Sequence, residues 1–515
     1  MILRIQPRSF TPYLAGALAV ASLTSGCASA GADAATAGIG GAATTPQSAG
    51  AAVPRPGAAG IGDRVHPGLG NGGYDVRRYG LALRFTHDLS AYTATTTLTA
   101  RARQALSRFD LDLNGPRVRS VTVDGRRAAW STSGQELRVT PRRPLPAGRE
   151  FTVRVTVRGT VATPRQARRL GTSAVGLIRA QGFVQSINQP SGAHRIAALA
   201  DHPAQKAPAT ITITAPSKVN SIANGRLTGT RHAGGSTTRR FTSGEKLAPE
   251  LIQIGLGRFS VVHRRGPGGI HLRYAVPTGK RKALMPQIDR VVPSAIGWFT
   301  RRLGPFPLRT YGIYATPLGG ELETQSLTLL ATSELTKSGM RHNGSDSIVT
   351  HEISHEYFGN SVSPRRWRDL WLNEGHAVYY ESLWSAAKHG SDAAKRFKSA
   401  YQDSGAQLRR QGPVAAPRPG AFKPRSMAPY GFGAYQGGAL TLYALRQKVG
   451  AATFQRIERA WVSEHRNNTA GTGDYIRLAS RVSGQNLRPF LRSWLYSTKL
   501  PSMPGHPNWK VKETK

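Results

Sequence analysis

The chain has 515 residues, with 70 Lys and Arg against 28 Asp and Glu, a formal net charge of +42. This length predicts two domains with a substantial hydrophobic core, and a single cysteine excludes a disulfide-stabilised fold. The arginines are scattered, and no helix-turn-helix, zinc-finger or aromatic–basic signature accompanies them, so no specific nucleic-acid partner is expected. The charge still predicts a modest affinity for anionic cell-surface material.

Residues 1–27 have the pattern of an export signal. Arg4 and Arg8 precede an Ala-rich apolar stretch that is too short to span a bilayer. This stretch ends in Leu-Thr-Ser-Gly before Cys27, which is similar to a bacterial lipobox, so we predict lipidation of Cys27 and a membrane anchor. Ordinary cleavage after Ala30, with release of a secreted protein, is the alternative. Both alternatives predict an exported protein, on the extracellular face of the cell membrane or secreted.

The next two segments are predicted to be a linker and a β domain. Residues 28–63 contain few large apolar side chains, which predicts a flexible Ala/Gly-rich linker. In residues 64–263, apolar residues alternate with polar or small ones between turn residues, which predicts an antiparallel β-sandwich-like domain. Strands are expected over residues 79–85, 95–100, 109–113, 151–157, 210–214 and 251–256.

Residues 264–500 predict a second, mostly helical domain, followed by a C-terminal tail over residues 501–515. Apolar residues at helical spacing predict a helix over residues 282–303, in spite of two prolines. A strand is expected near residues 311–314, and helices are expected to dominate from residue 345 to about residue 495. The predicted fold class is therefore α+β and multidomain.

The most informative motif is His-Glu-Ile-Ser-His, from His351 to His355. On a helix this spacing places the two imidazoles one turn apart on one face, within reach of one Zn²⁺ at roughly 2.0–2.1 Å. Glu374, in an Asn-Glu-Gly segment of a second predicted helix, offers a third ligand and leaves a fourth position open, as in catalytic zinc sites. Glu352 is then placed to act as general base on a zinc-bound water. These residues predict one Zn²⁺ per chain and zinc-dependent hydrolysis.

A simpler interpretation of the pentapeptide is an amphipathic core helix with exposed histidines, and the presence of Glu374 argues against it. His376 is not expected to bind the metal, because it points away from Glu374 on a helix. Asp369 is a candidate partner that would orient a ligand imidazole.

Residues 351–360 and 367–375 resemble the gluzincin metallo-aminopeptidases of peptidase family M1, the aminopeptidase N and leukotriene hydrolase family. Residues 320–324 are similar to the G-x-M-E-N motif of this family, with Leu and Thr in place of Met and Asn. The resemblance extends over about residues 72–504, and it implies a thermolysin-like zinc catalytic domain in a bacterial exported protein.

This resemblance also implies an activity and further site residues. The implied activity is an aminopeptidase that hydrolyses the first peptide bond of peptides with a free N-terminus. Glu323, with Gln189 and Gly320, is implied to bind the substrate and hold its amine. Tyr435 is implied to donate its phenolic proton to the oxyanion that forms on the scissile carbonyl.

Several alternatives remain at this point. Glu321 competes with Glu323 for the amine, and Tyr430 competes with Tyr435 for the oxyanion. The site could also serve another zinc hydrolase, such as an endopeptidase or an epoxide hydrolase. A non-catalytic, basic, surface-anchored binding protein is a further alternative, although intact metal ligands and an intact Glu352 argue against it.

Overall fold

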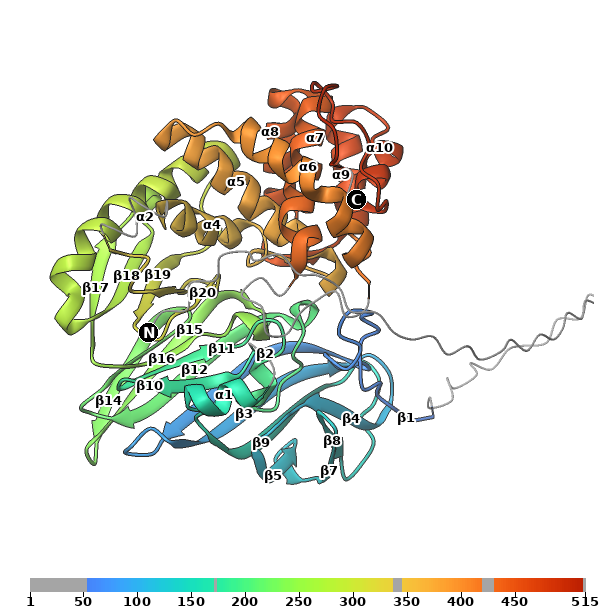
Figure 1. Cartoon of the computed structure of the whole chain (residues 1–515). Coiled ribbons are helices and arrows are strands. Elements are labelled where there is room, and N and C mark those ends of the chain that lie inside the picture. The colour runs from blue at the N-terminus through green and yellow to red at the C-terminus, as the bar shows by residue number, and fades with distance from the viewer. Residues whose placement is uncertain (1–52, 171–173, 337–344, 419–429, 513–515) are drawn as a thin grey trace, which may run out of the picture. The chain divides into compact units, whose positions relative to one another are not determined.

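The computed structural model describes residues 53–170, 174–336, 345–418 and 430–512. The predicted signal, Cys27 and most of the predicted linker lie outside these residues. In the described part of the chain, no helix combines the length and the hydrophobicity that a membrane span requires. Figure 1 shows a strand-rich N-terminal part and a helix-rich C-terminal part, which confirms the predicted α+β fold class.

An eight-stranded sheet is the largest element of the N-terminal part. Neighbouring strands are antiparallel except β12 and β2, which are parallel. Buried and exposed residues alternate along several strands of this sheet, which is why the sequence predicts strands here. Along β9, Val153, Val155 and Val157 are buried, whereas Arg154 and Arg158 are exposed. In spatial order the strands are β14 (Arg226–Ala233), β15 (Ser236–Leu247), β12 (Ala207–Pro216), β2 (Tyr74–Phe85), β3 (Ala91–Ala102), β9 (Glu150–Thr160), β5 (Arg117–Val123) and β6 (Arg126–Arg127).

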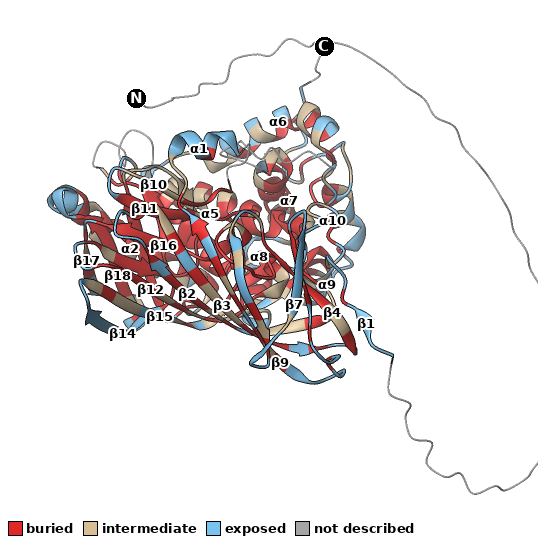
Figure 2. Ribbon diagram, turned by 90° about the horizontal axis from the view of Figure 1, so that it is seen from below, coloured by how far each residue is buried: buried red, intermediate tan, exposed pale blue. Residues whose placement is uncertain are grey.

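Two four-stranded sheets share a hydrophobic core with the large sheet. Phe109, Phe151, Leu177 and Ile254 are among the buried residues of this common core. Figure 2 shows buried residues along the central strands, whereas β7 and β14 are exposed throughout. The two sheets have the orders β1 (Arg55–Pro56), β4 (Leu106–Asp112), β8 (Glu136–Thr140), β7 (Ala129–Ser133) and β10 (Gly176–Ala180), β11 (Phe183–Ile187), β16 (Ile254–Gly257), β13 (Asn220–Ala223).

The described residues 53–63, which fall in the predicted linker, pack against both halves of the molecule. Strand β1 pairs with β4. Asp63 is 2% exposed, and its Oδ2 accepts hydrogen bonds from the Trp367 backbone amide at 2.7 Å and from His202 Nε2 at 3.1 Å. The packed part of the chain therefore starts upstream of residue 64.

The chain enters a further sheet, of five strands, at Phe259, shortly before the predicted boundary at residue 264. Helix α2 (Arg281–Leu303), which confirms the predicted helix, buries Ile288, Val292 and Ile296 in the same core as strands of this sheet. In spatial order the strands are β17 (Phe259–Arg265), β18 (His271–Pro277), β19 (Thr310–Thr316), β21 (Thr328–Ala331) and β20 (Glu321–Leu322).

Helices form most of the remaining chain, as predicted, with two short paired strands, β22 (Val362–Pro364) and β23 (Asn468–Ala470), between them. Helix α5 packs against both α4 and α7. These helical elements are α4 (Ser345–Tyr357), η6 (Trp367–Asp369), α5 (Trp371–His389), α6 (Ala393–Gln411), η7 (Gly433–Gly437), α7 (Gly438–Val449), α8 (Ala451–Glu464), α9 (Thr472–Ser483) and α10 (Arg488–Leu495).

Candidate active site

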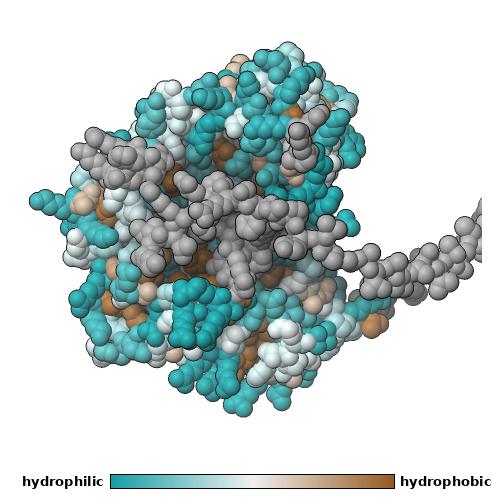
Figure 3. All heavy atoms as spheres, viewed as in Figure 1, coloured by the Kyte–Doolittle hydropathy of each residue, from teal (hydrophilic) through white to brown (hydrophobic). Residues whose placement is uncertain are grey.

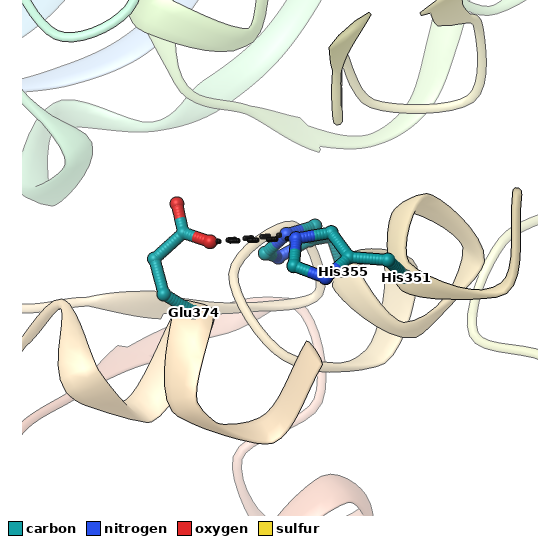
Figure 4. Close-up of side chains that lie close together, drawn as sticks. All are labelled: His351, His355 and Glu374. Carbon is teal, nitrogen blue, oxygen red and sulfur yellow. Dashed lines mark ion pairs between the residues drawn. The ribbon is translucent and has the colours of Figure 1, made fainter. Parts of the chain in front are cut away.

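The three predicted metal ligands meet between α4 and α5. Figure 4 shows the Glu374 carboxylate facing the imidazoles of His351 and His355. Glu374 Oε2 lies 3.6 Å from His351 Nε2 and 3.5 Å from His355 Nε2. A tetrahedral ion with bonds of 2.0–2.1 Å requires donor atoms about 3.4 Å apart. The spacing and the two-His-one-Glu chemistry of this donor set therefore fit zinc.

Each ligand imidazole has a polar partner on its other nitrogen. His351 Nδ1 lies 3.3 Å from Glu381 Oε2, and His355 Nδ1 lies 3.1 Å from Asn373 Oδ1. A proton on Nδ1 that is donated to these oxygens leaves Nε2 free to bind a metal, and it fixes the ring orientation. Gly359 makes room for this arrangement, because a Cβ at that position would lie 1.6 Å from Asn373 Oδ1.

The suggested partnership of Asp369 with a ligand imidazole is wrong. Asp369 Oδ1 accepts hydrogen bonds from the backbone amide and the hydroxyl of Thr472, at 3.0 and 2.7 Å, and so it holds the start of α9. His376 is also occupied elsewhere: its Nδ1 donates to the Leu372 carbonyl at 2.8 Å, and its Nε2 lies 3.2 Å from Glu458 Oε2. Both residues stabilise helix packing behind the metal ligands.

Two more carboxylates lie beside the ligands. Glu323, Glu352 and His355 each offer a donor atom within 4.8 Å of the other two. Glu352 Oε2 is buried and has no hydrogen-bond partner among the described residues. Burial raises the pKa of Glu352, with a further contribution from the charges of Glu323, Glu321 and Glu374 and an opposing one from His351. A buried carboxylate oxygen without a partner, next to the metal donors, is suited to accept a proton from a water or a substrate in this space.

Glu323 is held by amide side chains from three elements. Gln189 Nε2 donates to Glu323 Oε1 at 2.5 Å, and Asn373 Nδ2 lies 3.5 Å from the same oxygen. Asn360 Nδ2 donates to the Glu323 backbone carbonyl at 2.7 Å. The geometry thus brings together Glu323 and Gln189, as the resemblance implies. Glu321 lines the same cavity, but no such bond joins it to Gln189 among the described residues.

The loop around Glu323 keeps its shape with residues that differ from the family pattern. Thr324, at the usual Asn position, donates from its hydroxyl to the Leu327 carbonyl at 2.5 Å. Gly320 lines the cavity with a φ of +108°, a conformation that favours glycine. Gly320 thus lies just before β20, and the Thr324 bond lies in the short turn between β20 and β21 that carries Glu323.

Tyr435 reaches the site from a π-helical turn, η7. Its side chain lines the cavity together with Glu374, and burial, with a further contribution from the charge of Glu374, raises its pKa well above the usual value. The rival Tyr430 is 3% exposed and stacks on Trp367 outside the cavity. Single π-helical turns are frequent at functional sites, because the extra residue redirects a side chain.

A close contact between two glycines sets the position of Tyr435 relative to Glu374. A Cβ added to Gly438 would lie 2.8 Å from the Gly375 Cα, and one added to Gly375 would lie 2.7 Å from the Gly438 Cα. Gly375 directly follows the ligand Glu374, and Gly438 begins the helix after η7. This approach of α5 and α7 brings the phenol to the metal donors.

The site opens into a cavity of about 600 Å³. Its wall combines apolar side chains from both parts of the chain with five carboxylates, and none of the described residues that line it is Lys or Arg. The apolar residues are Ile178, Ile187, Leu318, Leu322 and Ile348, and the acidic ones are Glu321, Glu323, Glu352, Glu374 and Glu381.

Three residues that contact the site residues were not predicted from the sequence: Asn373, Glu381 and Asn360. Asn373 precedes a ligand, and Glu381 lies seven residues after Glu374, two turns along the same face of a helix. That spacing was a usable signal for Glu381. The contact of Asn360 with Glu323 joins segments distant in sequence, and no local pattern indicates it.

Comparison with known proteins agrees with this geometry. Residues 320–494 match the peptidase family M1 domain. Aminopeptidase M1-D of Oryza sativa subsp. japonica is 23% identical over 328 residues, and Aminopeptidase M1 of Arabidopsis thaliana is 24% identical over 339 residues. These alignments cover 59% and 64% of this chain but 36% and 38% of the relatives. The chain thus spans little more than a third of the length of the curated relatives it matches.

Solved structures match over more of their length. An M1 zinc metallopeptidase from Deinococcus radiodurans superposes with a TM-score of 0.72 at 27% identity, covering 86% of this chain and 98% of that protein. A variant of that enzyme bound to the peptide Tyr-Ser-Ala has the same TM-score and identity and covers 87% and 100%. These matches support zinc as the cofactor of the three-ligand site.

Proposed function

Since this chain belongs to peptidase family M1, we propose that it is a zinc-dependent aminopeptidase that removes residues from the free N-terminus of peptides. The observation that carries the proposal is the position of Glu323. This carboxylate lies beside the general-base candidate Glu352 and is held by Gln189, within one cavity. A related structure contains a bound tripeptide, which supports peptides as the substrate class.

In this mechanism the substrate amine is anchored first. Glu323 accepts a charge-assisted hydrogen bond from the α-ammonium group, and the Gln189 amide orients the carboxylate. Because Glu323 and Glu352 are so close, an anchored amine leaves only the first peptide bond within reach of the base. Internal bonds of the same peptide cannot reach it.

The chemical step uses Glu352 and Tyr435. When bound to His351, His355 and Glu374, zinc supplies Lewis-acid polarisation of the scissile carbonyl and a lower pKa for water. Glu352 accepts the proton of the attacking water at Oε2 and transfers it to the leaving amine. Tyr435 donates a hydrogen bond from its hydroxyl to the oxygen that gains negative charge.

A matched pair of substrates tests the proposal. We expect hydrolysis of leucyl-alanyl-alanine at its first bond and no hydrolysis of the N-acetylated form, with activity lost after chelation and restored by Zn²⁺. Cleavage of the blocked peptide at an internal bond would instead identify an endopeptidase. Turnover of an epoxide without turnover of either peptide would identify an epoxide hydrolase, and no turnover of any would favour a binding protein.

We also propose export, with a lipid anchor at Cys27, on the strength of the N-terminal sequence alone. The proposal rests on the basic start, the short apolar stretch and the lipobox-like residues before Cys27. Mass spectrometry of the mature N-terminus should find a diacylglyceryl-modified cysteine. An unmodified N-terminus at Gly31 would replace the anchor with secretion.

A further inference from the structure

A second cleft lies in the β-rich part of the chain, between β5, β9 and helix α1 (Pro164–Arg169) (Figure 1). It has a volume of about 480 Å³. Four arginines line it, Arg117, Arg119, Arg158 and Arg195, and no described residue of its wall is Asp or Glu. A concave surface lined by charges of one sign concentrates the electrostatic field, so this cleft attracts anions.

The sheet holds two of these arginines directly opposite each other. Arg117 on β5 pairs with Arg158 on β9. Like charges in directly opposite positions destabilise a sheet, and no acidic partner offsets this pair, because neither arginine forms an ion pair with a described residue. A register shift between Val118 and Ser120 inserts Arg119 as the extra residue of a β-bulge, which adds a third positive charge.

Arg195 contributes a charge that is partly withdrawn from water. Its Nε is buried and has no hydrogen-bond partner in the described chain. Burial lowers its pKa, and the charge of Asp201 opposes this shift. Asp201 itself is bound to His194 at 2.6 Å. A buried guanidinium nitrogen without a partner costs free energy, which a bound acceptor would offset.

We propose that this arginine cleft binds a phosphate group. Guanidinium groups match phosphate oxygens with paired hydrogen bonds, and one dianion would offset both the repulsion between Arg117 and Arg158 and the missing partner of Arg195. The phosphate group would be that of a free ion or of a phospholipid headgroup. This inference goes beyond the proposed function, because the cleft has its own lining and shares no lining residue with the zinc cavity.

Two exposed arginines elsewhere provide a matched control. Arg77 and Arg78 on β2 are exposed, like Arg117 and Arg158, but they do not line the cleft. A double substitution at either pair removes the same charge from the chain. The control therefore distinguishes specific binding in the arginine cleft from the general attraction of anions to a protein with a net charge of +42.

The test is calorimetric titration of the whole zinc-loaded protein with inorganic phosphate and with pyrophosphate at about 150 mM NaCl. We expect saturable binding at one site, unchanged in R77A/R78A and weakened about tenfold or more in R117A/R158A, since charge-assisted hydrogen bonds are lost. Absence of saturable binding in the wild type would overturn the proposal, as would equal weakening in both double variants.

Thermal unfolding shows whether the double variants are folded. Without phosphate, R117A/R158A should melt at or above the wild-type temperature, because a repulsive pair has been removed. Phosphate should raise the melting temperature of the wild type and of R77A/R78A but not that of R117A/R158A. Equal phosphate stabilisation of all three proteins would refute the site. Hydrolysis of leucyl-alanyl-alanine should be the same in all three.

Vesicles distinguish the two sources of the phosphate group. Co-flotation with phosphatidylglycerol vesicles that is lost in R117A/R158A and reduced by pyrophosphate would identify a headgroup site. Saturable phosphate binding without co-flotation would identify a soluble ligand. Co-flotation that falls equally in R77A/R78A would overturn the proposal for membranes, and phosphatidylcholine vesicles serve as the uncharged control.

Discussion

The zinc cavity and the arginine cleft carry opposite charges within one strongly basic chain. Five glutamates and no Lys or Arg are found among the described residues of the cavity, whereas four arginines and no Asp or Glu line the described cleft. The chain has only 28 acidic residues, so five in one cavity are a strong local concentration. The net charge therefore has the sign of the cleft but not that of the cavity, and each concave surface must be judged by its own residues.

The charge difference matches the ligand that we propose for each surface. A peptide N-terminus is a cation, and the acidic cavity would attract it even though the protein as a whole repels cations. Among the residues coloured in Figure 3, hydrophilic ones predominate at the surface. At physiological ionic strength the screening length is about 8 Å, which limits the reach of the exterior charges, whereas buried carboxylates are screened much less from a bound ligand.

The largest expected effect concerns the chemistry of the acidic cavity. Glu352→Gln should lower kcat about 10²–10⁴-fold, because the base that accepts the proton is lost. Zinc content, measured by atomic absorption, should be unchanged, and phosphate binding in the cleft should persist. Glu321→Gln, at another carboxylate of the same wall, is the control and should retain most of its kcat. A Glu352→Gln enzyme with near-normal kcat would contradict the assignment.

The next effect tests whether the cavity recognises a cation. Glu323→Gln should raise KM for leucyl p-nitroanilide about 10–100-fold, since the charged acceptor for the ammonium group is removed. kcat should fall by a smaller factor than the factor by which KM rises. A variant that loses kcat at unchanged KM would assign Glu323 to the chemical step and not to amine binding.

Zinc affinity should depend on the residues behind the ligands. Glu381→Gln and Asn373→Leu should each weaken zinc binding about 10–100-fold in competition with a chelator. The reason is that the native Glu381 orients His351 and the native Asn373 orients His355. Asp369→Asn is the matched control, since Asp369 bonds to Thr472. If Asp369→Asn weakened zinc binding as much as the other two, the partners of the imidazoles would have to be reassigned.

A smaller effect concerns the geometry that brings Tyr435 to the cavity. Gly438→Ala should cost about 1–3 kcal/mol in urea unfolding, because the new Cβ meets the Gly375 Cα at 2.8 Å. kcat should fall as well, since α5 and α7 separate. Gly279→Ala, where no atom lies within 4 Å of the added Cβ, should leave both quantities unchanged. Wild-type stability in Gly438→Ala would show that the helices adjust freely.

The smallest effect concerns an acid outside both surfaces. Burial, together with the charge of Asp110, raises the pKa of Glu136 to about 8. A raised pKa favours folding while the carboxyl is protonated, and this contribution is lost as pH rises through about 8. Glu136→Gln stays neutral, so it should melt a few degrees above the wild type at pH 9 and at a similar temperature at pH 5. Equal midpoints at pH 9 would show that Glu136 ionises without cost.

Much of this architecture was predictable because its signals are local. Alternation along β9 and helical spacing along α2 follow from which faces are buried, and the prolines of α2 do not end it. The two histidines lie one turn apart on a single helix, so their convergence follows from helix geometry alone. The resemblance to family M1, which the comparisons confirm, supplied Glu323, Gln189 and Tyr435 as candidates.

The remaining features depend on contacts between distant segments. Asp369 was a reasonable partner for a histidine by proximity in sequence, yet its carboxylate is taken by Thr472, about a hundred residues away. The arginine cleft needs the pairing of Arg117 with Arg158 and the contribution of Arg195 from a short 3-10 helix, Ala193–Arg195. In the sequence these arginines resemble all the others, and only the sheet register brings them together.

The bond between Asp63 and the Trp367 amide has a practical consequence for anyone who expresses this protein. A recombinant version that begins at residue 64 would remove the acceptor of two buried donors, the Trp367 amide and the His202 imidazole. The short pairing of Arg55 and Pro56 with β4 would be lost too. Residue 53 is thus a safer starting point for expression. A protease site engineered between Gly62 and Arg64 would cut the segment whose Asp63 bonds to both the β-rich and the helical part.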